Sequence, residues 1–220
     1  MVFIVAALGF DVRHVIRSIL RVGFRNVLGI YLIIPSGDTA PPTMRAIDEI
    51  KKIAELANVQ RIEIVAIDPL NLEESLMRIR KLLMDLSAGG NEIIISLGGG
   101  MRSLIIEILL SSITLPRDLL DNIRIVSDLE SRDGYIEFVL ADILAINELS
   151  NDLMRLIKYL GDKKETGPTE IAEELGIPKT TAWKMLNKLA ALKFIEKTSK
   201  GHYRLTQKGE RINRLIKYLF

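Results

Sequence analysis

The sequence predicts an α/β protein: a Rossmann-like, mostly parallel sheet followed by a small winged helix-turn-helix domain. Over residues 1–149, apolar runs of strand length alternate with segments of helical periodicity, as in stacked βαβ units. The rest of the chain follows the order helix, turn, helix, wing. The charge divides at the same place, because residues 1–149 hold 15 Lys and Arg against 20 Asp and Glu, whereas residues 150–220 hold 15 against 8.

The predicted strands are nearly continuous in apolar character, as expected of strands that are buried on both faces. They are "VFIVAAL", "NVLGIYLII", "RIEIVAI" and "EIIISL". With right-handed crossovers and the common strand order 3-2-1-4, the first and fourth strands lie side by side. The later segments "NIRIVSDLE" and "YIEFVLA" are too close together for a parallel crossover. We therefore expect them to form an antiparallel hairpin at the sheet edge.

Helix signals set the expected boundaries of the domains. Asn71 and Glu74 have the spacing of a capping pair, and Gly89 and Gly90 follow the last apolar position of the same helix. A long helix is expected from Asp142 to Leu160. We therefore divide the chain into an α/β domain at residues 1–141, a linking helix at 142–160 and a winged helix-turn-helix domain at 161–220.

The C-terminal domain has the most specific pattern in the sequence. The helices "TEIAEELG" and "TTAWKMLNKLAALKF" are separated by the tight turn "IPK", and Gly176 suits the end of the first helix. Two short strands around "TSKGH" would form the wing. Apolar residues of the first helix and turn are expected to pack against the inner face of the second helix: Ile171, Ala172, Leu175 and Ile177 against Ala182, Leu186 and Leu189.

The opposite face of the second helix is the candidate DNA-reading surface. Its polar ridge begins at the helix N-terminus, where a recognition helix reaches base edges. Lys and Thr side chains can contact phosphates and bases there, and wing residues can reach the flanking backbone. A winged helix that binds protein is the alternative, which the positive charge disfavours. The predicted DNA-binding residues are Lys179, Thr180, Thr181, Lys184, Asn187, Lys188, Lys200, His202, Tyr203 and Arg204.

Composition excludes several kinds of site and location. Without cysteine there is no disulfide, thiolate zinc site or cysteine nucleophile, and only His14 and His202 offer an imidazole. We expect no metal centre and no cofactor. The apolar stretches fall short of the roughly 18 residues of a membrane span, and the first eight residues lack the features of a signal peptide. We expect a cytoplasmic protein with no membrane contact.

The loop "SLGGGMRS" is the candidate ligand site, together with "LGFD" after the first strand. In an open parallel sheet, loops beyond the carboxyl ends of the first and fourth strands face each other across a crevice. Glycines permit close approach, the following helix N-terminus attracts anions, and Arg102 offers a guanidinium fork for phosphate. The predicted ligand-binding residues are Gly9, Phe10, Asp11, Ser36, Gly98, Gly99, Gly100, Met101, Arg102 and Ser103.

The nature of the ligand stays open at this point. The loop fails the last position of G-x-G-x-x-G at Ser103 and lacks the G-K-[ST] of a P-loop, so NAD and ATP hydrolysis are weakly supported. Three glycines also fit an ordinary strand-to-helix turn. Asp11 suits an N-cap better than a catalytic acid, and His14 is expected on a helix surface. The domain has no evident acid–base pair, and we predict no catalytic residues.

Taken with the two loops and the winged helix of Gly167 to Leu205, the whole chain resembles archaeal CRISPR-associated transcription regulators, which join a CARF domain to a C-terminal winged helix. The resemblance implies a homodimer whose two crevices merge into one pocket for a cyclic oligoadenylate, typically cyclic tetra-adenylate. It also implies that residues 9–11 and 98–102 contact this ligand. Binding would alter how two winged helices fit double-stranded promoter DNA at CRISPR loci or adaptation genes, in antiviral defence.

Two other functions remain as alternatives. The chain could be a metal-independent ring nuclease with a DNA-binding tail, although its crevice loops hold serines and no lysine. It could also be a repressor that responds to a dinucleotide or another metabolite. The last helix, "GERINRLIKYLF", has an apolar stripe at Ile212, Leu215, Ile216 and Leu219, which suits packing either within the winged helix or across a dimer.

Overall fold

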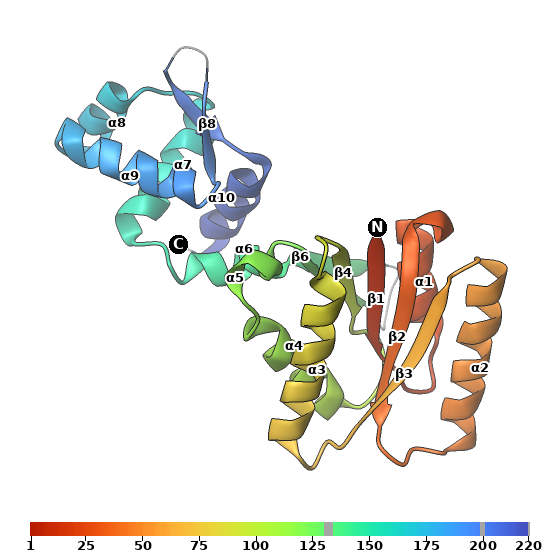
Figure 1. The fold of residues 1–220 in the computed structure, drawn as a ribbon. Helices are drawn as coiled ribbons and strands as arrows, with labels where there is room; N and C mark the ends of the chain where they lie inside the picture. The colour runs from red at the N-terminus through yellow and green to blue at the C-terminus, as the bar shows by residue number, and fades with distance from the viewer. Residues whose placement is uncertain (130–133, 199–200, 220) are drawn as a thin grey trace. The chain divides into compact units, whose positions relative to one another are not determined.

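The computed structural model describes residues 1–129, 134–198 and 201–219. The chain divides into two compact units, Met1–Ala141 and Asp142–Phe220. The first contains a six-stranded sheet in the order β3-β2-β1-β4-β5-β6 (Figure 1). This order includes the predicted 3-2-1-4 arrangement. The α/β prediction for this part of the chain is therefore confirmed.

The elements of the first unit alternate as the apolar pattern predicts. In chain order they are β1 (Val2–Ala7), α1 (Arg13–Val22), the 3-10 turn η1 (Phe24–Asn26), β2 (Val27–Pro35), α2 (Pro41–Leu56), β3 (Arg61–Ile67), α3 (Leu72–Ser87), β4 (Glu92–Ser96), α4 (Arg102–Ile113), α5 (Arg117–Leu120), β5 (Ile123–Asp128) and β6 (Tyr135–Val139).

Strands β1 to β5 pair in parallel, so the carboxyl ends of β1 and β4 lie side by side. Helices α1 and α2 cover one face with a core of Ile, Val and Ala side chains, and α3 and α4 pack together on the opposite face (Figure 1). Strand β6 pairs antiparallel with β5, which confirms the predicted edge hairpin. Asn71 accepts the backbone N–H of Glu74 at 3.3 Å, which confirms the cap of α3.

The predicted single linking helix is wrong. Two helices, α6 (Leu140–Ile146) and α7 (Asn151–Lys163), occupy this part of the chain. The non-helical segment between them ends at Ser150, whose side chain accepts the backbone N–H of Leu153 and so caps the start of α7. The buried face of α7, which includes Leu156 and Leu160, belongs to the core of the C-terminal unit. This helix is therefore part of the winged-helix unit rather than a spacer.

The rest of the second unit has the predicted order of a winged helix. After α7 come α8 (Pro168–Leu175), α9 (Lys179–Ala191), β7 (Ile195–Lys197), β8 (Tyr203–Leu205) and α10 (Gln207–Leu219). Gly176 has the left-handed conformation that ends α8, and Ile171, Ala182 and Leu186 are fully buried as predicted. Ile212 and Ile216 of α10 belong to the same core, which shows packing within this unit.

Candidate ligand loops and DNA-reading helix

The loops after β1 and β4 touch through two glycines. A Cβ added at Gly9 would lie 3.0 Å from the backbone nitrogen of Gly100. Gly100 has a φ of +87°, and a Cβ there would lie 3.0 Å from the carbonyl carbon of Ala7. Larger residues would therefore force the two loops apart. The predicted juxtaposition of "LGFD" and "SLGGGMRS" is present in the fold.

The other two glycines of the loop pack against His14, which corrects the prediction that His14 lies on a helix surface. The residue is 3% exposed. A Cβ at Gly98 would lie 2.4 Å from the His14 Cβ, and one at Gly99 would lie 2.5 Å from its Cε1. Close packing of a strand-to-helix turn thus explains these glycines without a ligand.

Hydrogen bonds hold His14 in this position. Its Nε2 lies 3.1 Å from the carbonyl oxygen of Ala7, at the end of β1, whereas its Nδ1 is buried with no partner among the described atoms. Ser18 donates to the carbonyl oxygen of His14 at 2.9 Å, and Ser96 at the end of β4 approaches the same oxygen. Burial lowers the pKa of His14, so the neutral ring is favoured.

The beginning of α4 has unused hydrogen-bonding groups. No side chain caps this helix at Met101, and the backbone amides of Arg102, Ser103 and Leu104 have no acceptor within the described chain. The hydroxyl of Ser103 is buried and also unpartnered there. Arg102 is exposed, with no carboxylate within ion-pair distance among the described residues. This combination of donors and positive charge suits an anion.

Asp11 is close to its predicted cap role but is displaced by one residue. The N-cap of α1 is Val12, and Asp11 accepts the backbone N–H of Arg13 at 2.9 Å. Its carboxylate also pairs with the Arg13 guanidinium at 2.6 Å, and this hydrogen bond lowers the pKa of Asp11. Phe10 beside it is 70% exposed. Ser36, after β2, is exposed as well.

Glu107 is a polar residue that sequence reasoning missed. It lies on α4, one turn after Ser103, and is 3% exposed with its Oε2 atom unpartnered among the described residues. Burial raises the pKa of this carboxyl, and the nearby charge of Asp68 adds to the shift. Its only sequence signal was a single acidic residue inside the otherwise apolar run "SLIIEILL".

The described residues contain no group of three or more His, Asp or Glu side chains that is placed to hold a metal ion. Within the same ranges, no helix is long and apolar enough to cross a membrane.

The predicted recognition residues share one exposed face of α9. The buried side of this helix consists of Ala182, Leu186 and Leu189. The predicted contacts on the helix are all exposed: Lys179, Thr180, Thr181, Lys184, Asn187 and Lys188. On the preceding helix, α8, the two acidic residues Glu173 and Glu174 are also exposed. The positive charge of the helix-turn-helix is therefore carried mainly by α9.

The wing differs in part from the prediction. Tyr203 is 5% exposed, and its backbone pairs with Thr166, so its side chain belongs to the core and does not reach a groove. Arg204 is exposed but bound to Glu196 at 2.6 Å, and Nδ1 of His202 lies 3.6 Å from Glu165. Lys200 lies outside the described residues.

Trp183 is a second residue that sequence reasoning missed. It lies on α9 beside Lys184, is 38% exposed, and meets the ring of Tyr203 edge-on with 6.2 Å between centroids. This contact places it between the recognition helix and the base of the wing. It is the single tryptophan of the chain, so its fluorescence reports on this part of the second unit.

Comparison with known families separates the same two parts of the chain. Residues 1–138 match the model described as the Csa3 CRISPR-associated Rossmann-like domain, which covers more than half of the chain. The chain belongs to the Csa3 CRISPR-associated family. Residues 153–199 match the IclR helix-turn-helix domain. This Csa3 family member therefore joins a CRISPR-associated Rossmann-like domain to a DNA-binding domain, as the resemblance to CARF regulators implies.

Solved structures include one that matches this Csa3 family chain over most of its length. It is described as the crystal structure of protein VC1899 from Vibrio cholerae, with 14% sequence identity and a TM-score of 0.48. The match covers 96% of the present chain and 64% of the other, so this chain spans less than two thirds of that protein. No curated protein matches the chain.

The packing of His14 predicts how this Csa3 loop responds to substitution. Gly99→Ala should lower the free energy of unfolding by about 1–3 kcal/mol, because the added methyl group overlaps the imidazole. In a His14→Ala background the same change should cost much less. Urea denaturation of the wild type, both single variants and the double variant measures this coupling. Equal costs in the two backgrounds would contradict the contact.

Proposed function

We propose that this protein is a ligand-responsive transcription regulator of CRISPR loci or adaptation genes, controlled by a cyclic oligoadenylate. Two copies would share one pocket for cyclic tetra-adenylate, formed by the loops after β1 and β4. The observation that carries the proposal is the pairing of a CRISPR-associated Rossmann-like domain with a helix-turn-helix whose second helix exposes a basic, polar face.

The chemistry of α9 supports binding to double-stranded DNA. Lys184 and Lys188 are exposed one turn apart, so both can approach the same phosphate backbone. Thr180 and Thr181 lie in the first turn of the helix, where side chains of a recognition helix reach base edges. The net charge of +7 over residues 150–220 favours association with a polyanion.

The chemistry at the start of α4 supports an anionic ligand. A phosphate at this position could accept hydrogen bonds from the unused amides of Arg102 and Ser103. The exposed guanidinium of Arg102 adds a positive charge and a further pair of N–H donors. The buried hydroxyl of Ser103, which has no hydrogen-bond partner among the described residues, could then donate to the phosphate.

Exposed apolar side chains on the same loops support a homodimer at this edge of the sheet. Phe10 is 70% exposed and Met101 is 50% exposed, and each is the apolar residue of its loop that faces solvent. A second copy related by a two-fold axis would bury them and place two Arg102 side chains around a ligand with its own symmetry. Ligand binding would then bias the relative placement of the two α9 helices on successive half-sites.

We propose regulation without catalysis. Cleavage of a ribose-phosphate linkage requires a base within hydrogen-bond reach of the attacking hydroxyl. Asp11 is already bound to Arg13, and the ring of neutral His14 is buried beneath Gly98 and Gly99. Full recovery of intact cyclic tetra-adenylate after incubation with the protein supports this assignment, and multiple turnovers to linear products would replace it with the ring-nuclease alternative.

Arg102→Ala tests the ligand half of the proposal. The variant should weaken binding of cyclic tetra-adenylate by about tenfold or more, because a charge-assisted fork to phosphate is lost. DNA affinity without ligand should stay unchanged. Calorimetry measures the first quantity and fluorescence anisotropy of a labelled duplex the second. Arg78→Ala, an arginine change on α3, is the control, and equal ligand affinity in all three proteins would remove Arg102 from the site.

Lys184→Ala and Lys188→Ala test the DNA half. Each should weaken binding to a mixed-sequence duplex and lower the slope of log affinity against log salt by about one, since each removes one phosphate contact. Anisotropy titrations between low and moderate salt measure this slope. Lys52→Ala in α2 removes the same charge from the first unit and should leave the slope unchanged. A slope that is constant across all variants would show that another face binds DNA.

A further inference from the structure

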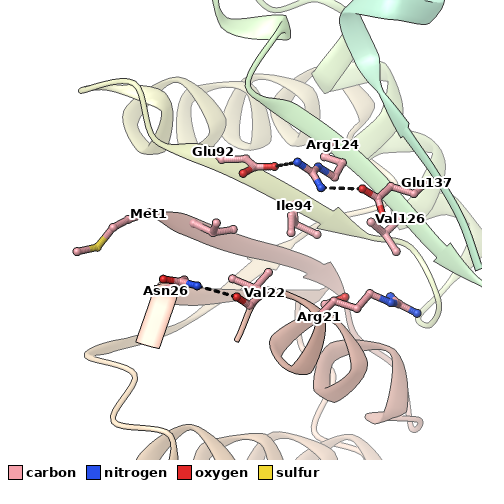
Figure 2. A pocket seen from close by; sticks show the side chains of 11 residues that line it. Met1, Arg21, Val22, Asn26, Glu92, Ile94, Arg124, Val126 and Glu137 are labelled. Carbon is pink, nitrogen blue, oxygen red and sulfur yellow. Dashed lines mark hydrogen bonds and ion pairs between the residues drawn. The ribbon is translucent and has the colours of Figure 1, made fainter. Parts of the chain in front are cut away.

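A cavity of about 270 Å³ lies in the first unit, away from the glycine loops. It opens at the amino ends of β1 and β4, on the face of the sheet that carries α1, whereas the loops follow the carboxyl ends of the same strands. Figure 2 shows the cavity as a slot between the end of α1 and a row of charged side chains on β4, β5 and β6.

The floor of the slot is apolar. Val2, Ile94 and Val126 form a small buried cluster, and Val22 at the end of α1 packs against it. These side chains come from three neighbouring strands of the sheet and one helix, so their positions are fixed by the fold. An apolar surface of this kind can pack against the face of a ring.

One wall is a fixed row of charges. Arg124 binds Glu92 at 2.5 Å and Glu137 at 2.7 Å, so its guanidinium is held from both sides (Figure 2). A carboxylate has about four acceptor positions. Both acids therefore keep acceptors for a ligand while they hold the arginine, and the arginine plane can face a ring edge-on or stack with it.

The opposite wall offers an amide. Asn26 donates from Nδ2 to the carbonyl oxygen of Val22 at 2.8 Å, which fixes the amide and leaves Oδ1 as an acceptor (Figure 2). Arg21 also lines the slot, where it is bound to Asp128 and its guanidinium lies 3.9 Å from the centroid of the Tyr135 ring. Its charge is thus already neutralised by an acid beside the slot.

The charges of the slot are balanced. Arg17, Arg21 and Arg124 carry three positive charges, and they form ion pairs with the three acids Asp128, Glu92 and Glu137. A phosphate or a carboxylate would have to displace these pairs, and an additional cation would meet the guanidinium groups. An uncharged ligand that both donates and accepts hydrogen bonds meets neither obstacle.

We propose that this slot binds an uncharged nucleobase or nucleoside. The ring would lie on Val22, Ile94 and Val126, and its exocyclic amino group would donate to Asn26 Oδ1 or a wall carboxylate. The volume is slightly below the range of about 300–1,000 Å³ that holds drug-sized ligands, so it fits one base with its sugar and not a dinucleotide. The site is separate from the loops that we propose for the cyclic ligand.

Ser18 connects the slot to the glycine loop. It lines the cavity and donates to the carbonyl oxygen of His14, whose ring supports Gly98 and Gly99. Its hydroxyl also lies 3.2 Å from that of Ser96, at the end of β4. An occupant of the slot would therefore touch a residue that holds the ligand loop in place.

Calorimetry with adenosine, guanosine, cytidine and uridine tests the proposal on the full chain. At least one nucleoside should bind, and its 5′-monophosphate should bind no more tightly. Val22→Phe narrows the slot and Asn26→Ala removes an acceptor, so each should weaken binding by about tenfold. Leu20→Phe is the matched control, because Leu20 is exposed on the same helix and does not line the slot.

Arg102→Ala separates this site from the proposed effector loops. Nucleoside affinity should be unchanged in this variant. Loss of nucleoside binding in Arg102→Ala with retention in Val22→Phe and Asn26→Ala would overturn the slot as the site and assign the nucleoside to the loops. The absence of heat for all four nucleosides at millimolar concentration would also overturn the proposal, whereas it would leave the regulator proposal intact.

Discussion

The contact between the His14 ring and the glycines at positions 98 and 99 is the constraint on which the candidate ligand site depends. It fixes the loop after β4 against the start of α1, and the approach of Gly9 to Gly100 joins this loop to the end of β1. Any side chain at these glycines would overlap the imidazole or the neighbouring backbone. The relative position of both loops therefore follows from the buried, neutral His14 with its hydrogen bonds and from the close contact of Gly9 with Gly100.

This packing separates the structural residues of the loop from those available to a ligand. The glycines are needed for the fold, so they do not by themselves indicate a phosphate site. Arg102 and the first amides of α4 are held in place by the same packing but have no partner within the described chain. The proposed effector site therefore rests on these groups, with the tight loop as a rigid support. A comparable division holds in α9, where the buried face fixes the exposed basic face.

Much of the fold could be predicted from the sequence, because apolar periodicity and end signals are local. The strand order, the cap of Asn71 on α3 and the buried face of α9 followed from such signals. The errors at His14 and Tyr203 have a different cause: both are polar side chains that tertiary contacts bury. The break before α7 was missed because apolar spacing continues across it. The slot beside Arg124 was also missed, since it combines residues from strands far apart in sequence.

We propose that an anion at the loops of the first unit controls DNA binding by the second. The most direct test is the affinity of the full chain for its own operator, isolated first by selection from a pool of random duplexes, with and without saturating cyclic tetra-adenylate. Fluorescence anisotropy of the labelled operator measures both affinities. We predict a change of about fivefold or more, in the range of typical coupling between sites. Identical affinities, with the ligand shown by calorimetry to be bound, would contradict it.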